Sequence, residues 1–197
     1  TGAWDAKLAR IRPKQEKQGY WAHREKTKTP VSFVYIHGFS AGPLELEPTI
    51  QKLAAMSNAN LFITRLRAHG LESGAAFRDV RAEEWLAGKV ETIAVGHLIG
   101  GGGGGVGLSE SAPLALMAAE AGWRGCREMK PHGLILLSPN FRLANRGADV
   151  LMPEAMAPFT ETVMRLVEGD EHEFPLRNEW HRERWTSRYP IEGAVQL

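Results

Sequence analysis

Ser109 lies in the pentapeptide GLSES at residues 107–111, which precedes the apolar stretch LALMAA. A serine nucleophile on a sharp strand-to-helix turn needs small residues two positions before and after it, because larger side chains would collide with the strand and the helix. Gly107 meets this requirement, and Ser111 meets it less well than glycine would. A helix beginning at Glu110 would direct backbone N–H groups at an oxyanion formed on a substrate. The pattern also fits a serine that only caps a helix, and the pentapeptide alone leaves both interpretations open.

A second motif, HGFS at residues 37–40, follows the apolar run VSFVYI. The loop after such a strand can supply a second backbone N–H to the same oxyanion. The plainer alternative is that His37 and Gly38 only end the strand. Two such motifs in this order and spacing are less expected by chance than either one alone.

Strand-like and helix-like runs alternate along the chain, and this alternation predicts an α/β fold with a mostly parallel sheet. The helix predicted over residues 82–99 places Trp85, Ile93 and Leu98 on one apolar face, which we expect to contact the core. Residues 8–28 are compatible with an antiparallel hairpin at the sheet edge. The predicted strands are 31–36, 61–66 and 133–138, and the predicted helices are 49–57 and 82–99.

Six consecutive glycines, residues 100–105, precede the GLSES motif. A strand that leads into a nucleophile is normally rich in β-branched residues, whereas glycines have no side chain to pack and lose more conformational freedom on folding. We therefore expect either a short strand over residues 106–108 or an uncertain sequence. A phosphate-binding loop is disfavoured because the GK[ST] signature and a properly placed GxGxxG are missing.

Composition limits the class of protein further. The chain has 197 residues, 43% of them hydrophobic, which is enough for one sizeable core. A formal charge of +1 gives no reason to expect nucleic acid or anionic lipid as a partner, so a small neutral or amphiphilic molecule fits better. Cys126 is the only cysteine, which excludes an internal disulfide and a cysteine-rich zinc site. No apolar run approaches the roughly 20 residues of a membrane span. The compartment stays open, with the cytoplasm slightly favoured.

Several segments in order resemble the bacterial α/β-hydrolase superfamily of esterases and lysophospholipase-like serine hydrolases: VYIHGFSAGPLELEPTIQKLA, NLFITRLRAHG, EEWLAG, GLSESAPLALMAA, GLILLSPNF and RWTSRYP. The resemblance implies the α/β-hydrolase fold and cleavage of a small-molecule carboxylic ester through an acyl-enzyme, without a cofactor or metal. It implies that Ser109 is the nucleophile and that the backbone N–H groups of Phe39 and Glu110 form the oxyanion hole. Gly107 and Ser111 would support the turn, and His37 would be structural.

The family order places an acid and then a histidine after the serine. No triad acid or base is identified in this chain, although its sequence offers Asp149, Asp170, His132, His172 and His181. The simplest explanation is that the chain is the amino-terminal portion of a longer protein, is nearly inactive as given, and has its acid and base beyond Leu197. The alternative is a non-catalytic binding or scaffold protein of the same fold. The oligomeric state is not indicated.

The predicted domain organisation has three parts. Residues 1–150 form the α/β-hydrolase core, residues 151–190 form a helical cap over the carboxyl edge of the sheet, and residues 191–197 lead into further core strands. Apolar residues of the cap either line an acyl-chain pocket or pack the cap itself: Met152, Met156, Phe159, Met164 and Leu166.

Overall fold

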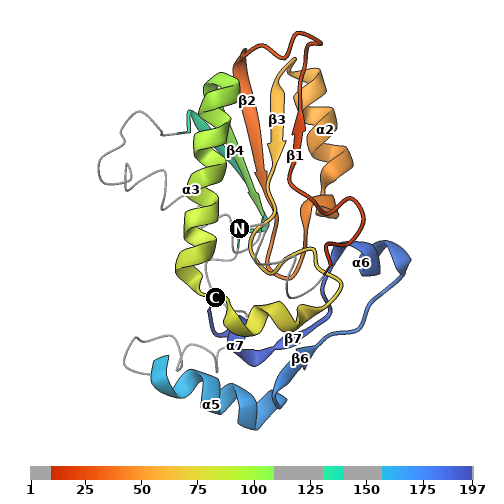
Figure 1. Cartoon of the computed structure of the whole chain (residues 1–197), viewed down its shortest axis with the longest axis vertical. Coiled ribbons are helices and arrows are strands. Elements are labelled where there is room, and N and C mark those ends of the chain that lie inside the picture. Colours follow the sequence, from red (N-terminus) through yellow and green to blue (C-terminus); the bar gives the residue numbers. More distant parts are fainter. Residues whose placement is uncertain (1–9, 109–130, 140–156, 197) are drawn as a thin grey trace.

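A computed structural model of the chain describes residues 10–108, 131–139 and 157–196. At its centre is a five-stranded sheet in the order β1-β3-β2-β4-β5 (Figure 1). Strands β2 to β5 run parallel, and β1 pairs antiparallel with β3 at one edge. The α/β prediction is confirmed. The strands are Gln18–Tyr20 (β1), Thr29–Ile36 (β2), Asn60–Ile63 (β3), Gly100–Leu108 (β4) and Gly133–Leu137 (β5).

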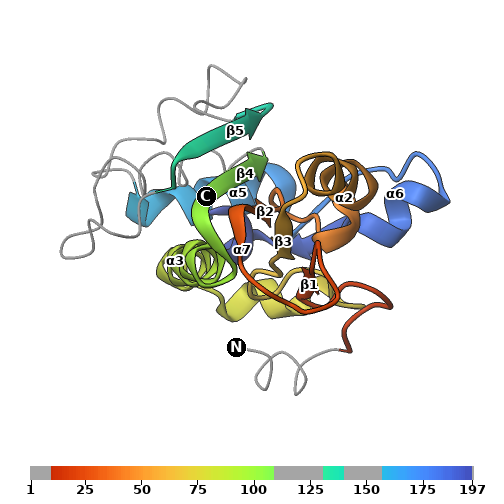
Figure 2. The same ribbon diagram turned by 90° about the horizontal axis from the view of Figure 1, so that it is seen from above.

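Two helices connect the parallel strands and cover opposite faces of the sheet (Figure 2). Helix α2 (Glu47–Met56) joins β2 to β3, and helix α3 (Ala82–Ile99) joins β3 to β4. Side chains alternate between the faces of a strand, so Tyr35 packs on the α2 side while the hydroxyl of Ser32 donates a 2.7 Å hydrogen bond to the Gly96 carbonyl of α3. Because helices cover both faces of the sheet, the sequence of the central strand β2 is mostly apolar rather than alternating.

The buried side chains of the described segments form two clusters, one on each side of the sheet. The α2 side holds Tyr35, Ile50, Ala54, Leu61 and Ile63. The α3 side holds Ile36, Leu66, Ala68, Leu71, Ala76, Phe77, Val80, Trp85 and Tyr189. The second cluster includes the 3-10 helix η2 (Gly74–Asp79) and reaches strand β7 near the end of the chain, so it ties the sheet to the last described segment.

The glycine run is a full strand, and the expectation of a short strand over residues 106–108 was wrong. Strand β4 pairs with β2 from Gly100 onward and with β5 from Gly104 onward. A side chain is excluded at the start of the strand, since a Cβ on Gly100 would lie 2.5 Å from the Cβ of Ser32. Main-chain hydrogen bonds to two neighbours therefore hold a strand that its side chains could not specify.

Segment 157–196 lies at the carboxyl end of the parallel strands (Figure 1). It contains α5 (Ala157–Glu168), β6 (Glu171–Glu173), α6 (Glu179–Arg184), β7 (Arg188–Pro190) and α7 (Ile191–Ala194). The prediction of helices alone was incomplete, because β6 and β7 pair antiparallel. Each strand has only three residues, and the Glu171 and Arg188 side chains form an ion pair between the two strands. Segments this short and charged show no strand pattern in the sequence. The lead-in role expected for residues 191–197 stays a prediction.

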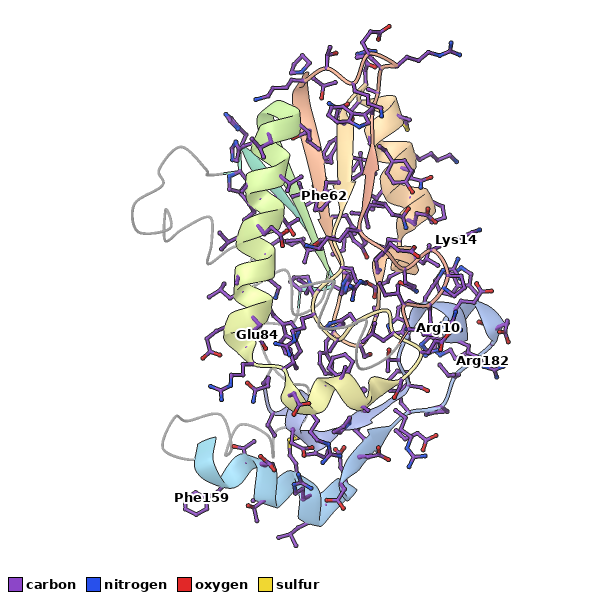
Figure 3. The ribbon with its side chains drawn as sticks, in the orientation of Figure 1. Arg10, Lys14, Phe62, Glu84, Phe159 and Arg182 are labelled. Carbon is purple, nitrogen blue, oxygen red and sulfur yellow. The ribbon has the colours of Figure 1, made fainter. Side chains whose placement is uncertain are left out.

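Three further expectations need correction. The described part of segment 8–28 holds a single strand, β1, whose partner is β3 rather than a second arm of a hairpin. Leu98 is 68% exposed, although it was expected to contact the core. Phe159 points away from the rest of the chain at the start of α5 (Figure 3), and Leu166 is also exposed. Within the described ranges, no helix is both long and apolar enough to cross a bilayer.

Candidate active site at the carboxyl ends of β2 and β4

The connections of the sheet define one place where a site is expected. The chain leaves β2 toward β3 on one side, whereas it leaves the adjacent β4 toward β5 on the other side. Connections that diverge in this way open a crevice at the carboxyl ends of the two strands, where open α/β sheets bind their ligands. The topology thus selects the end of β2 and the end of β4.

Both motifs found in the sequence follow these two strand ends. Strand β2 ends at Ile36, directly before HGFS, and β4 ends at Leu108, directly before Ser109 in the chain. Ile36 lies opposite Gly107 in the parallel register, and neighbouring strands are about 4.8 Å apart. The two motifs therefore begin side by side at the carboxyl edge of the sheet.

The loop that follows β2, residues 37–45, is held by a buried carboxylate. Glu45 is 4% exposed, and its Oε2 accepts hydrogen bonds of 2.9 Å from both the Gly38 N–H and the Tyr35 hydroxyl. Burial, and then the charge of Glu45, raise the pKa of Tyr35 well above its usual value, so its hydroxyl stays protonated as a donor. The Gly38 amide donates inward to Glu45, and the oxyanion role of the Phe39 amide in this loop stays a prediction.

His37 is a neutral structural residue. It is fully buried, its Nε2 accepts a 3.1 Å hydrogen bond from the Leu66 N–H, and its Nδ1 lies 2.9 Å from the Gly38 carbonyl. These contacts assign the proton to Nδ1. Burial lowers the pKa of His37 to about 4, while its hydrogen bond to Gly38 opposes the shift. The side chain joins the loops after β2 and β3.

Phe39 and Ser40 form the turn of the loop. The Phe39 ring contacts His69, Phe77, Trp85 and Tyr189 edge-on, at centroid distances of 5.1 to 5.8 Å. Ser40 is buried and has a φ of 57°, in the left-handed region that residues other than glycine seldom adopt. Such a conformation persists only where its surroundings determine it, and it often marks a functional loop.

The structure is similar to solved hydrolases. It matches the metagenome-derived lipolytic enzymes LipS and LipT with a TM-score of 0.65 and 16% identity, over 95% of this chain and 71% of the other. It matches the α/β hydrolase GrgF from Penicillium sp. sh18 with a TM-score of 0.57 and 12% identity, over 92% and 71% of the two chains. The chain has the α/β-hydrolase fold.

A further α/β-hydrolase neighbour is a soluble variant of monoglyceride lipase from Saccharomyces cerevisiae, with a TM-score of 0.60 and 10% identity. That match covers 91% of this chain and 62% of the lipase. No family model matches the sequence, and no curated protein matches it. The predicted fold is therefore confirmed by structure alone, at identities too low to transfer an activity.

Within this α/β-hydrolase fold, the predicted site residues divide into two groups. Phe39 lies in the 37–45 loop, and Gly107 lies in β4 at the carboxyl edge, while their predicted roles stay predictions. Ser109, Glu110 and Ser111 lie outside the described residues. Their roles as nucleophile, oxyanion donor and turn support stay predictions.

Four of the five candidates for a triad acid or base lie in the described part of the chain. His132 directly precedes β5 and so lies at the amino-terminal end of that strand, whereas the predicted site lies at the carboxyl ends of β2 and β4. His172 is bonded to Glu168, and its ring contacts Tyr189. The Nδ1 of His181 accepts from the Arg177 N–H, and Asp170 pairs with Arg165 at the surface. Asp149 lies outside the described residues, and the contacts named above do not place any described candidate beside the ends of β2 and β4.

Several polar residues near the site were not predicted. Beneath the Phe39 ring, His69 is 1% exposed, and its Nδ1 donates to the Arg67 carbonyl at 2.8 Å. Burial, and then the neighbouring His37, lower its pKa well below the usual value. Lys89 is 2% exposed on α3. The only signal for the burial of Lys89 in the sequence was its position four residues after Trp85, which places both on the same face of the helix. Among the described residues, no group of three histidine, cysteine or acidic side chains could hold a metal ion.

Proposed function

We propose that the protein is a serine hydrolase that cleaves carboxylic esters through an acyl-enzyme. One observation carries the proposal: β2 and β4 end side by side at the topological switch point, and their next residues are HGFS and Ser109. This is the arrangement expected if one strand presents a nucleophile and the adjacent loop supplies an oxyanion donor.

In the proposed reaction, the Ser109 hydroxyl attacks the carbonyl carbon of the ester while a base accepts its proton. Backbone N–H groups of Phe39 and Glu110 stabilise the oxyanion, and its collapse expels the alcohol, which takes the proton from the base. Water then hydrolyses the acyl-enzyme by the same steps and regenerates the serine. Gly107 and Ser111 leave room for the turn. The base and the acid that orients it are not assigned to residues of this chain.

Composition and the neighbours support a substrate class for this proposal. A formal charge of +1 favours a neutral or amphiphilic ester over a strongly anionic ligand. The similar structures include lipolytic enzymes and a monoglyceride lipase, which supports esters of acylglycerol or lysophospholipid type. We also propose that residues 1–150 form the core and that residues 151–190 act as a cap over its carboxyl edge.

A fluorophosphonate probe applied to the full-length protein tests this proposal, because the probe modifies an activated serine covalently. We expect labelling of the wild type at Ser109, confirmed by mass spectrometry of the modified peptide. Ser109→Ala should abolish both the labelling and the hydrolysis of p-nitrophenyl esters, while Ser57→Ala, at an exposed serine after α2, should retain both. A correctly folded wild type that is not labelled would contradict the proposal and favour a non-catalytic binding protein.

A further inference from the structure

The segment formed by residues 178–190 packs directly on the 37–45 loop. The Thr186 N–H donates a 2.7 Å hydrogen bond to the Ser40 carbonyl, and the Nε of Arg184 donates a 3.1 Å hydrogen bond to the Leu44 carbonyl. The Tyr189 ring lies 5.1 Å from that of Phe39. Two carbonyls and one side chain of the loop are therefore held by a segment more than a hundred residues away in the sequence.

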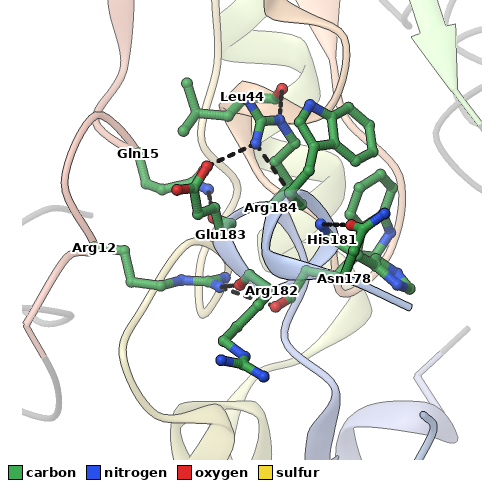
Figure 4. Close-up of polar contacts among 10 residues, drawn as sticks. Arg12, Gln15, Leu44, Asn178, His181, Arg182, Glu183 and Arg184 are labelled. Carbon is green, nitrogen blue, oxygen red and sulfur yellow. Dashed lines mark hydrogen bonds and ion pairs between the residues drawn. The ribbon is translucent and has the colours of Figure 1, made fainter. Parts of the chain in front are cut away.

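A third segment, near the amino terminus, holds the first two together (Figure 4). Helix α6 has only six residues, and the last carbonyls of a helix have no partner within it. The Nη1 of Arg12 donates to the carbonyls of Arg182 at 2.8 Å and Trp185 at 2.9 Å. The Nε2 of Gln15 donates to the Glu183 carbonyl at 2.7 Å. Two side chains thus cap the carboxyl end of α6.

The same side chains fix the residue that reaches the loop. The Nη2 of Arg12 donates a 3.1 Å hydrogen bond to the Thr186 hydroxyl, next to the N–H that bonds Ser40. Gln15 is fully buried and packs against the loop itself, since a Cβ on Gly42 would lie 2.1 Å from the Gln15 Oε1. The Arg12 side chain donates to two carbonyls and a hydroxyl, so these hydrogen bonds fix the orientation of their partners.

We propose that Arg12 and Gln15 are positioning residues for the oxyanion donor of the 37–45 loop. By capping α6 they orient the Thr186 N–H toward the Ser40 carbonyl, which holds the left-handed turn at Ser40 and the direction of the adjacent Phe39 amide. The catalytic part of this inference rests on the proposed function, whereas the structural part does not. An oxyanion donor displaced by about 1 Å reduces a rate by about 100-fold, so such fixation matters.

Hydrogen exchange of the full-length protein tests the structural part without reference to activity. In Arg12→Gln, we expect amides of residues 38–45 to exchange at least about tenfold faster than in the wild type. The variant loses the hydrogen bonds that orient Thr186 toward the loop, so the loop should unfold locally more often. Amides of β2 and β3 should be unchanged. Gln15→Glu keeps the volume and removes the donor, so it should have the same effect. The matched control is Arg182→Gln, whose side chain forms an exposed ion pair with Glu179.

Kinetics test the catalytic part. Arg12→Gln and Gln15→Glu should lower kcat by about 10- to 100-fold and leave KM within about twofold, because the oxyanion forms only in the transition state. Unchanged loop exchange in both variants, at wild-type melting temperature, would overturn the positioning role. Faster loop exchange with kcat unchanged would limit that role to stability and overturn its catalytic part. Esterase activity that survives Ser109→Ala would instead overturn the proposed function and leave the exchange result standing.

Discussion

The Nε2 of His37 accepts a 3.1 Å hydrogen bond from the backbone N–H of Leu66, which joins the loops that follow β2 and β3. Only the neutral imidazole can accept this bond while its Nδ1 donates to the Gly38 carbonyl. The contact therefore links the geometry of the candidate site to the protonation state of one buried side chain.

This link predicts that stability depends on pH in the acid range. The pKa of His37 is lowered from 6.5 to about 4, so the unfolded chain binds more protons between these values, and the stabilisation present above pH 6.5 is lost as the pH falls toward 4. His37 accounts for about 3 kcal/mol of the expected loss in the free energy of unfolding, measured by urea denaturation at several pH values, and His69, whose pKa is also lowered, adds to it. His37→Asn should have a shallower dependence, whereas His23→Gln, at an exposed histidine, should follow the wild type. Equal slopes for the wild type and His37→Asn would refute this assignment.

Glu45 should be essential for the stability of the 37–45 loop. Replacement by alanine leaves the buried Gly38 N–H and Tyr35 hydroxyl without this acceptor, so we expect a loss of about 2–4 kcal/mol in the free energy of unfolding. Tyr35→Phe removes one donor together with its need for a partner, and it should lose only about 1 kcal/mol. Glu91→Ala, at an exposed ion pair with Lys17, should change stability by less than about 0.5 kcal/mol. A similar loss for Glu45→Ala and Glu91→Ala would show that the buried carboxylate has no special role.

Two adjacent glycines of β4 should respond oppositely to the same substitution. A Cβ on Gly100 would lie 2.5 Å from the Ser32 Cβ and 2.8 Å from the Ser32 backbone nitrogen, so Gly100→Ala should destabilise the protein by about 2 kcal/mol or more. The nearest atom to a Cβ on Gly101 is the Pro30 carbonyl oxygen at 3.4 Å, so Gly101→Ala should be neutral or stabilise by up to about 1 kcal/mol. Thermal unfolding of the two variants measures the difference, and equal melting temperatures would contradict the pairing of β4 with β2.

Helix α3 offers a second matched pair. Ile93 is 9% exposed and Leu98 is 68% exposed, although both belong to the apolar face expected from the sequence. Ile93→Ala should lower the free energy of unfolding by about 2–4 kcal/mol, and Leu98→Ala should change it by less than about 0.5 kcal/mol. Denaturant unfolding of both variants provides the measurement. A larger loss for Leu98→Ala would mean that another part of the protein covers this residue.

The exposure of Leu98 shows where periodicity alone fails. Periodicity predicted the bounds of α3, but the line along which the helix meets the sheet is set by close approach. A Cβ on Gly96 would lie 2.8 Å from Val34, and the Ser32 hydroxyl bonds the Gly96 carbonyl directly. Because the helix meets the sheet at Gly96 and Ser32, it is rotated so that Leu98 faces solvent. Only the tertiary packing determines this rotation of the helix.

The strand at the glycine run could not be predicted for a related reason. Periodicity is a property of side chains, and residues 100–105 have none. By contrast, β2 was predicted from its apolar run, and the positions of HGFS and GLSES at two strand ends followed from their order in the sequence. The sequence therefore indicated the end of β2 and the end of β4, although it missed the extent of β4.

The supporting residues of the site could not be predicted from the sequence, for two different reasons. Glu45 acts on Gly38 within one loop, and no pattern marks its carboxylate as buried. Arg12 and Gln15 bond residues about 170 positions away, from a segment whose sequence indicated only an edge hairpin. The polar residues of these two segments are typical of exposed positions, and the sequence alone does not show that the two segments contact each other.

The capping of α6 by Arg12 and Gln15 sets the timing of folding during synthesis. These side chains are synthesised well before their partners, because the carbonyls that accept their hydrogen bonds lie 168 to 173 residues later in the chain. At ribosomal speeds of about 5–20 residues per second, they wait about 10–30 s for those partners. Until then the turn at Ser40 lacks the Thr186 amide that secures it, so the 37–45 loop of the nascent protein is completed only after residue 186 has been synthesised.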